Sequence, residues 1–364
     1  METRRSRVVA AVLLSTLVAP LGVPLVSPAL PPVRDAFGLT DGTASLLISA
    51  YFVPGILLAP FAGAVAARAG PRRVLVTSLV GFGVTGGAIA AAPSFSVALA
   101  IRVLQGVAAT GIFVTAVVMI GARFEGATRR TVLGWNAAAL SAGAAVYPLV
   151  GGALAAQSWA APFLVYLIAL PVALAVHLAI EPEPPAATAA ATRVRDAVRG
   201  ATAGDRWLLY LSAFLTDGFL LGVVLTAVPF RLVSEYGLSP LGVGAVVTAG
   251  MVASLVVSLS AGRLARRAPS RTLIAAGQGC YAVGMGGVWL AASPLGVTAA
   301  VLVIGGGVGL SLPAVDAAIS DRFEPGAQAG ALGLRVSTSF AGRTVGPLVF
   351  AATSGPAALL GGIV

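Results

Sequence analysis

Charged side chains inside long apolar segments are the residues of this chain that could do chemistry. Arg102, Asp217, Asp316 and Arg343 each interrupt such a segment. A charge at the middle of a lipid bilayer costs about 2.5–3.5 kcal/mol on insertion scales, so a retained charge is a candidate for function. Groups of this kind can exchange protons, form ion pairs or attract a charged solute.

Asp217 is the candidate proton carrier. It lies about 15 Å along its predicted helix from Trp207, near the middle of a core about 30 Å thick. A carboxyl group withdrawn from water can be poised to take a proton from one side and lose it to the other. The alternative is a neutral Asp217 that hydrogen-bonds Thr216 or a backbone carbonyl for packing.

Arg102 and Gln105 form a second candidate site. Arg102 lies about 10 Å into its apolar segment, with Gln105 one turn further on the same helix face. A functional role is favoured, and the alternative is an arginine that extends its guanidinium to the outer headgroups. Arg343 needs an acid, which Asp316 or Asp217 could supply, and we expect an embedded structural ion pair there.

Other polar residues in the apolar segments are weaker candidates for a functional role. Asn136 and Gln278 are predicted to hydrogen-bond between helices, and His177 and Arg335 to lie near the membrane surface. The single cysteine, Cys280, is expected to be a packed apolar residue. No nucleophile–base set and no metal-ligand spacing stands out, so we expect neither an enzyme nor a bound metal or cofactor.

The apolar segments must be membrane helices. The chain has 364 residues, is 58% hydrophobic and 10% charged, and has a mean hydropathy of +0.96. Soluble domains carry about 25% charged residues. Runs near 20 apolar residues suffice to cross a bilayer, and without water they must be helical. The predicted spans are 8–30, 44–66, 74–92, 95–120, 131–155, 160–180, 207–230, 241–261, 272–291, 295–320 and 330–352.

The two halves of the chain repeat at one offset of 199 residues. The sequence therefore predicts two six-helix bundles, 1–180 and 207–364, joined by a cytoplasmic linker, 181–206. The stub after Pro356 is expected to begin a truncated twelfth helix. An even number of spans per half makes the repeats parallel. The matched positions include Gly63 and Gly262, Arg68 and Arg267, Arg72 and Arg271, Gly38 and Gly237, Arg123 and Arg322, and Pro148 and Pro347.

Basic residues are concentrated in alternate loops. The net charge is +10, and all 23 basic residues are arginines. The intervening loops, between the arginine-rich ones, hold only Arg34 and Arg231. This asymmetry predicts a cytoplasmic N-terminus. We expect a multi-pass, monomeric protein of a prokaryotic cytoplasmic membrane whose basic balance reflects topology and anionic lipid, with no nucleic-acid partner.

Two motifs resemble those of the major facilitator superfamily. The loop after the second span is similar to the family's Gly-x-Leu-Ala-Asp-Arg-x-Gly-Arg-Arg signature, but Ala67 replaces the acid and Arg266 is its repeat counterpart. Any latch between the halves that this acid forms in the family must here be weaker or built differently. Arg102, Gln105 and Gly106 look like the family's Arg-x-x-Gln-Gly motif. The matching loop positions are Gly63, Arg68, Gly70, Arg72 and Arg73.

A third motif, on the fifth span, is similar to one associated with the drug–proton antiporters of that family. Tyr147 replaces the glycine before the proline. The resemblance implies a central cavity lined by Arg102, Gln105 and Asp217, in which Arg102 takes part in proton coupling by biasing a neighbouring acid. The residues that carry it are Gly143, Pro148, Gly151 and Gly152.

These patterns together predict a secondary transporter with a small-molecule substrate, coupled to protons. The specific expectation is an exporter of small lipophilic molecules, because few charges are predicted in the cavity. A uniporter or a nutrient importer of the same fold is the first alternative. A non-transporting membrane sensor or scaffold is the second, although 181–206 is too short for a folded signalling domain.

Overall fold

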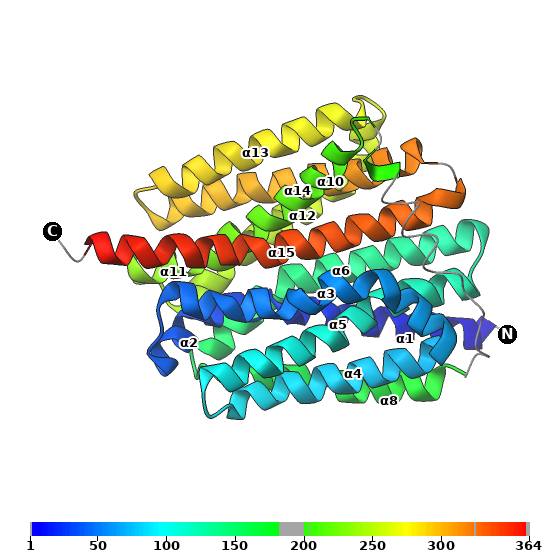
Figure 1. The fold of residues 1–364 in the computed structure, drawn as a ribbon, viewed down its shortest axis with the longest axis horizontal. Helices are drawn as coiled ribbons and strands as arrows, with labels where there is room; N and C mark the ends of the chain where they lie inside the picture. Colours follow the sequence, from blue (N-terminus) through cyan, green and yellow to red (C-terminus); the bar gives the residue numbers. More distant parts are fainter. Residues whose placement is uncertain (1, 182–199, 203, 324, 362–364) are drawn as a thin grey trace.

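The computed structural model describes residues 2–181, 200–202, 204–323 and 325–361, and these contain helices but no strand. The long helices run along a shared direction (Figure 1). The α-helices, long and short, are α1 (Glu2–Val18), α2 (Leu30–Phe37), α3 (Asp41–Ala69), α4 (Pro71–Ala88), α5 (Phe95–Arg123), α6 (Gly126–Ala155), α7 (Ala161–Leu164), α8 (Ala169–Ala179), α10 (Trp207–Phe219), α11 (Val228–Ser234), α12 (Pro240–Ala265), α13 (Ser270–Leu290), α14 (Pro294–Arg322) and α15 (Pro325–Gly361).

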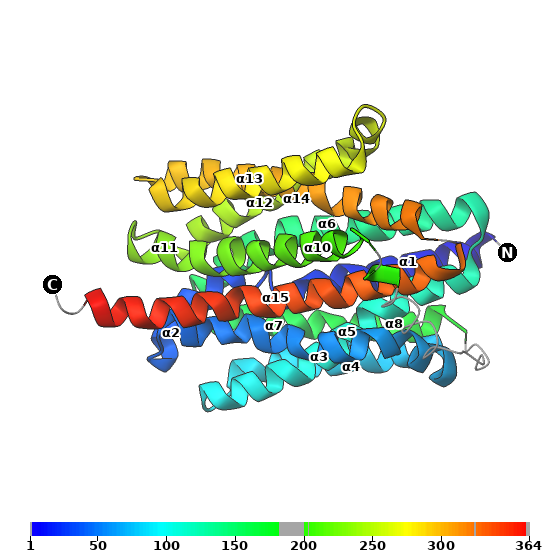
Figure 2. The same cartoon turned by 45° about the horizontal axis from the view of Figure 1, so that its top comes forward.

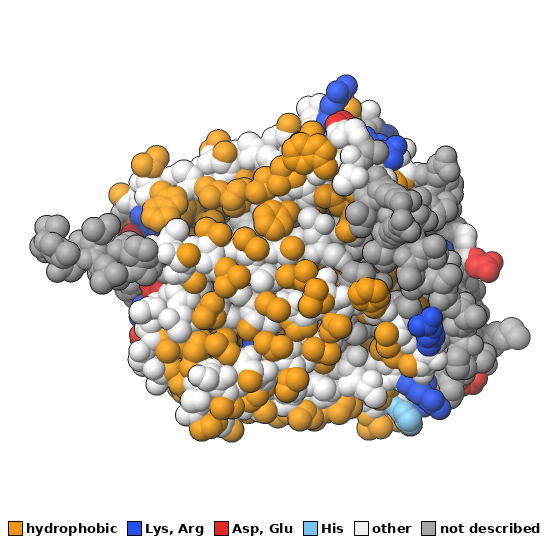
Figure 3. Space-filling model, in the orientation of Figure 1, with side chains coloured by type: hydrophobic (Ala, Val, Ile, Leu, Met, Phe, Trp, Pro, Cys, Tyr) orange, Lys and Arg blue, Asp and Glu red, His pale blue; other side chains and the backbone are white. Residues whose placement is uncertain are grey.

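The all-helical membrane fold is confirmed. Among the described residues, 10 segments are long and apolar enough to cross a membrane, and they coincide with the first ten predicted spans. Apolar side chains cover the face drawn in Figure 3, with arginines gathered toward one end. The chain is therefore a multi-pass membrane protein.

The eleventh span is longer than predicted. The sequence predicts that it ends near residue 352 and that a twelfth helix begins after Pro356. Instead, α15 is continuous from Pro325 to Gly361. The stub therefore belongs to the eleventh span, and the described residues contain no start of a twelfth helix. The predicted linker 181–206 lies mostly outside the described residues.

The internal repeat recurs in local backbone geometry. Gly38 has a φ of 62° and Gly237 a φ of 63°, a left-handed conformation that glycine adopts without a steric penalty. Each closes a short helix, α2 or α11, before the next span begins. Four helices of the repeat begin with a hydroxyl that accepts a backbone N–H, as N-caps do. These caps are Thr40 and Ser239, and Ser94 and Ser293.

Span 1 is broken in its middle. Between α1 and α2 the chain forms two 3₁₀ turns, η1 (Ala19–Gly22) and η2 (Ser27–Ala29). Pro20, Pro24 and Pro28 lie in or beside this break. Because proline lacks an N–H and clashes with the preceding turn, three prolines at this spacing disrupt the helical hydrogen bonds. The break leaves backbone carbonyls near the membrane centre in need of donors.

The two halves meet along two helix pairs. α3 packs against α15, and α6 packs against α12; Figure 2 keeps α15 next to the α2–α3 region. Ser49 Oγ donates to the Thr344 carbonyl at 2.9 Å across the first pair. In the second, a Cβ on Gly152 would overlap the carbonyl oxygen of Pro240. We call these two contacts the seam.

Candidate functional site

Arg102 on α5 is fully buried, with 0% of its surface exposed. Its Nε donates to the Leu47 carbonyl at 3.0 Å, and its Nη1 donates to Gln105 Oε1 at 2.5 Å and to the Tyr166 hydroxyl at 3.1 Å. Its Nη2 donates to the carbonyl of Gly22. These acceptors belong to α3, α5, η1 and the 3₁₀ turn η4 (Val165–Ile168), so one guanidinium joins four elements.

The break in span 1 provides one acceptor for Arg102. The Val26 N–H donates to Val23 O at 2.9 Å, which leaves the Gly22 carbonyl without the helical donor that would normally be four residues away. Arg102 and the Tyr166 hydroxyl both donate to this carbonyl. The arginine therefore satisfies the polar backbone that the prolines exposed.

The surroundings of Arg102 exclude one of the two sequence-based alternatives. An arginine that reaches the headgroups is wrong, because the side chain is entirely buried. The resemblance implies a neighbouring acid, yet no carboxylate of the described residues forms an ion pair or hydrogen bond with Arg102. Its charge instead lies 4.7 Å from the ring centroid of Tyr51, a favourable cation–π distance.

Asp217 and Arg343 form an ion pair inside the membrane region. Arg343 Nε lies 2.9 Å from Asp217 Oδ1, and the two side chains are 27% and 1% exposed. Asp217 is thus the acid that Arg343 needs. The alternative pair, Asp316–Arg343, is wrong, because Asp316 binds Arg335 instead.

Two glycine pairs bring the backbones of α10 and α15 into contact at this ion pair. Gly218 and Gly222 face Gly342 and Gly346, each pair spaced by four residues. A Cβ on Gly346 would overlap the carbonyl oxygen of Gly218, and a Cβ on Gly342 that of Phe214. Small residues at this spacing let membrane helices approach closely. Asp217 and Arg343 directly adjoin Gly218 and Gly342 in the chain, so the ion pair lies at this close crossing.

The span that carries Asp217 changes its winding just beyond the acid. Residues Leu220–Ala227 form a π-helix, η5. The Thr226 hydroxyl donates to the Leu221 carbonyl at 2.6 Å, five residues back. π-Helical turns are rare and often occur at functional sites.

One oxygen of Asp217 has no partner. Oδ2 is buried and accepts no hydrogen bond from the described residues. The alternative in which Thr216 holds a neutral Asp217 is not seen; Thr216 Oγ1 instead accepts from Gln278 Nε2 at 2.9 Å. A buried carboxylate oxygen that accepts no hydrogen bond is costly.

The predicted interhelical hydrogen bonds are confirmed. Gln278 on α13 also donates to Ser212 Oγ on α10 at 3.0 Å. Asn136 Oδ1 on α6 accepts from Thr16 Oγ1 on α1 at 2.5 Å. Each bond joins two spans within one half.

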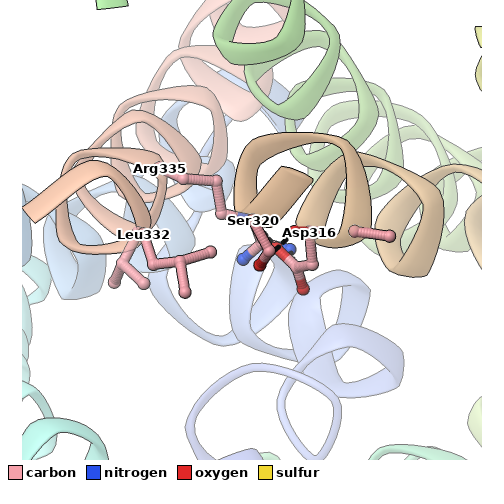
Figure 4. A pocket seen from close by; sticks show the side chains of 6 residues that line it. Asp316, Ser320, Leu332 and Arg335 are labelled. Carbon is pink, nitrogen blue, oxygen red and sulfur yellow. Dashed lines mark hydrogen bonds and ion pairs between the residues drawn. The ribbon is translucent and has the colours of Figure 1, made fainter. Parts of the chain in front are cut away.

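Asp316 and Arg335 face each other in an open pocket of about 370 Å³ between α14 and α15 (Figure 4). Arg335 Nε lies 2.8 Å from Asp316 Oδ1, and the Asp316 side chain is 47% exposed. Arg335, whose side chain is 14% exposed, is therefore mostly buried and paired with an acid. The pocket is lined by Asp316, Ala317, Ser320, Leu332, Arg335 and Val336.

Arg343 connects the ion pair to the seam. Its guanidinium carbon lies 5.5 Å from the ring centroid of Phe52 on α3 and 5.8 Å from that of Phe340 on α15. Arg102 lies against the ring of Tyr51, the residue before Phe52 on α3. The expectation that Arg102, Gln105 and Asp217 line an open cavity is not met in this conformation, because all three are buried. Within the Asp217–Arg343 pair, it is Arg343 that lies against α3 at the seam.

The predicted gating-loop motif joins α3 to α4. Gly70 takes a φ of 89° at the turn, which favours glycine. Arg72 Nη2 donates to the His177 carbonyl at 2.6 Å, so it ties the loop to the end of α8. The side chain of Ala67 lies outside the described set. Of the remaining positions, Gly63 lies inside α3, and Arg68 and Arg73 are exposed.

The predicted fifth-span motif packs α6 against span 1 and α12. A Cβ on Gly151 would overlap the carbonyl oxygen of Leu25, and one on Gly143 would lie 3.1 Å from Pro20 Cγ. Tyr147, which replaces the family's glycine, donates its hydroxyl to a span 1 carbonyl at 2.7 Å. Gly152 and Pro148 of the motif instead face α12 at the seam.

Solved structures of other transporters share the fold. A bacterial homolog of the human lysosomal transporter Spinster, inward-facing and unoccupied, superposes with a TM-score of 0.79 at 17% identity, over 96% of this chain and 82% of that one. The D-xylose–proton symporter gives a TM-score of 0.74 at 15% identity, over 95% and 89%. At these identities the likeness concerns the fold alone.

Curated relatives match a shorter stretch. The bacillibactin exporter of Bacillus subtilis is 32% identical over 155 residues, 40% of this chain and 38% of that protein. The quinolone resistance protein NorA of Staphylococcus aureus is 28% identical over 143 residues, 39% and 37% of the two chains. The matches thus span well under half of these relatives.

A model of one family covers nearly the whole chain. It is described as the Major Facilitator Superfamily and matches residues 12–347. The helical fold is the one expected from the sequence. The chain belongs to the Major Facilitator Superfamily of membrane transporters.

Proposed function

We propose that this transporter is a proton-coupled exporter of small lipophilic molecules in a bacterial cytoplasmic membrane, with its N-terminus in the cytoplasm. The names of two relatives, an exporter and a resistance protein, support export. Three aromatic side chains that meet between the two halves, Phe52, Phe113 and Phe340, support a lipophilic substrate. Protons are exchanged for substrate, which makes the protein an antiporter.

The observation that carries the proposal is the ion pair between Asp217 and Arg343. Its acid is 1% exposed and has one unpartnered oxygen, and its arginine lies between Phe52 and Phe340 at the contact between the halves. Ionised Asp217 neutralises Arg343. Protonated Asp217 leaves a lone cation at the seam, which changes the free energy of separating α3 from α15.

A proton on Asp217 and a substrate at the seam therefore act on the same contact. A substrate that enters between the aromatic rings displaces the arginine side chain, whereas a proton releases it from its acid. Because both events alter the one seam, the occupancy of the proton site can decide when the halves move. This is the physical requirement for coupling through a conformational equilibrium.

The test has two steps. A susceptibility panel in a host that lacks its own exporters identifies a transported compound, and ethidium is the first probe. Purified protein in proteoliposomes is then assayed for ethidium movement under an imposed pH gradient. We expect gradient-driven transport by the parent protein and a loss of about tenfold or more in Asp217→Asn, which cannot exchange a proton.

Asp316→Asn is the matched control, because that acid is also paired with an arginine but is half exposed. It should retain gradient dependence. Unchanged pH-driven transport in Asp217→Asn would remove this residue from the mechanism. Accumulation that ignores the proton gradient in the parent protein would instead favour the uniporter or importer alternative.

A further inference from the structure

The second half contains a mostly buried set of polar side chains around Asp217 that the first half lacks. We call this set the polar cluster. Each member has an apolar counterpart at the offset of the repeat, so packing alone does not require polar groups at these positions, where burying them is costly. The members are Ser212, Thr216, Asp217, Gln278, Tyr281 and Ser311, and their counterparts are Leu13, Leu17, Val18, Leu79, Phe82 and Ile112.

Tyr281 is the member of the polar cluster that lies beside the acid. It is on α13, which packs against α10, and it is 1% exposed. Its ring centroid lies 5.9 Å from that of Phe219, two residues beyond Asp217 on α10. Gln278, three residues before Tyr281, donates to Thr216, the residue before Asp217. The Tyr281 hydroxyl is close enough to Asp217 for the charge of the acid to act on it.

The hydroxyl of Tyr281 has a proton available for Asp217. This hydroxyl and Asp217 Oδ2 are both buried, and neither forms a hydrogen bond of full geometry with a described residue. Thr216 comes within hydrogen-bonding reach of Tyr281. Because the Gln278 amide group donates to Thr216, the proton of Thr216 is directed elsewhere and can go to the Tyr281 oxygen. The proton of Tyr281 is then left for a carboxylate, and a small rotation of the carboxyl group or one bridging water joins the two.

We propose that Tyr281 is a positioning residue for Asp217, whose hydroxyl donates to the carboxylate and helps to set the pH at which the acid takes up a proton. This role rests on the proposed function, in which Asp217 carries the proton. Two other titratable groups face Asp217: Arg343 from α15 pairs with it, and the charge of Asp316 on α14 reaches it. Cys280 on α13 acts on Tyr281, and η5 has no titratable side chain. Among these groups, the tyrosine is the neutral donor.

Infrared spectroscopy of the purified full chain in detergent, recorded as a function of pH, tests the proposal. The difference between the parent protein and Asp217→Asn assigns the protonated carboxyl band of Asp217. In Tyr281→Phe this band should persist to a pH about one unit higher, because the carboxylate has lost a hydrogen bond that favours its charged form. The pH profile of ethidium transport should move in the same direction. Phe82 occupies the equivalent position of the first half, so a phenylalanine fits this packing.

The matched control is Tyr210→Phe, which removes another buried hydroxyl from the second half. Tyr210 on α10 is 7% exposed and donates to the Ala331 carbonyl at 3.3 Å. The Asp217 band should titrate in this variant as it does in the parent protein.

An unchanged titration in Tyr281→Phe, or an equal shift in Tyr210→Phe, would overturn the role of Tyr281 and leave Asp217 as the proton carrier. The absence of any carboxyl band that Asp217→Asn removes would instead overturn the proposed function, and the role of Tyr281 with it. If Tyr281→Phe does not fold, the tyrosine C–O stretch of the parent protein decides. It must change over the same pH range as the carboxyl band and stay constant in Asp217→Asn.

Discussion

Arg102 places a guanidinium among neutral oxygens where the resemblance implies an acid. Its partners are three carbonyl or amide oxygens and one hydroxyl, from four elements around the break in span 1. A buried charge held in this way stabilises a particular backbone path. The residue thus acts first as a structural link, and any effect on proton movement would pass through the shape of span 1.

Replacing Arg102 by alanine should destabilise the protein strongly. The change leaves the Leu47 carbonyl and the Gln105 amide oxygen without their donor and removes one of the two donors to the Gly22 carbonyl. Loss of one partner in a buried charged network costs about 3–5 kcal/mol. We expect a lower melting temperature in detergent, followed by intrinsic fluorescence. Arg102→Lys should recover only part of it, because lysine cannot reproduce the planar set of donors. A variant that melts like the parent but no longer transports would instead assign Arg102 a chemical role.

At the scale of helices and turns, the sequence predicts the repeated backbone turns but not the partners of the buried charges. The offset of 199 residues predicts that Gly38 and Gly237 serve equivalent turns, and both have the same left-handed backbone. The partners of Arg102 could not be predicted in this way. They are mostly backbone carbonyls, which every residue carries, and they become available only because three prolines break span 1. The choice between Asp217 and Asp316 for Arg343 likewise depends on how closely α10 and α15 pack, which the glycine spacing alone did not reveal.

That packing leads to a prediction for α15. Gly346→Ala adds a Cβ that would overlap the carbonyl oxygen of Gly218, so α15 must move away from α10 and stretch the ion pair. Overpacking of this kind costs about 1–3 kcal/mol. Gly333→Ala on the same helix is the control, because a Cβ there meets nothing within 4 Å. We expect Gly346→Ala to lower the melting temperature and gradient-driven transport, and Gly333→Ala to leave both near the parent values. Similar melting of the two variants would contradict a tight crossing at Gly346.

For the whole molecule, the seam is the structure that must open if solute is to pass between the halves. Ser49 is buried there, 2% exposed, with its hydroxyl on the Thr344 carbonyl. Gln157, in the connection between α6 and α7, is exposed. Cys280 is the single cysteine, so Cys280→Ser provides a background in which one introduced thiol can be followed. A thiol at either position then reports whether its surroundings meet water.

In that background, Ser49→Cys should react slowly with a membrane-impermeant maleimide when no substrate is present, because two helices cover it. Addition of a transported compound should accelerate the reaction, since each cycle must separate α3 from α15 for some of the time. Gln157→Cys should react quickly in both conditions. It therefore serves as the control that the reagent is active and that the protein can be labelled. Rapid labelling of Ser49→Cys at rest would mean that the seam is open without substrate. Slow labelling during demonstrated transport would mean that solute passes without separating these helices, and the coupling assigned to the Asp217–Arg343 pair would then lack its mechanical basis.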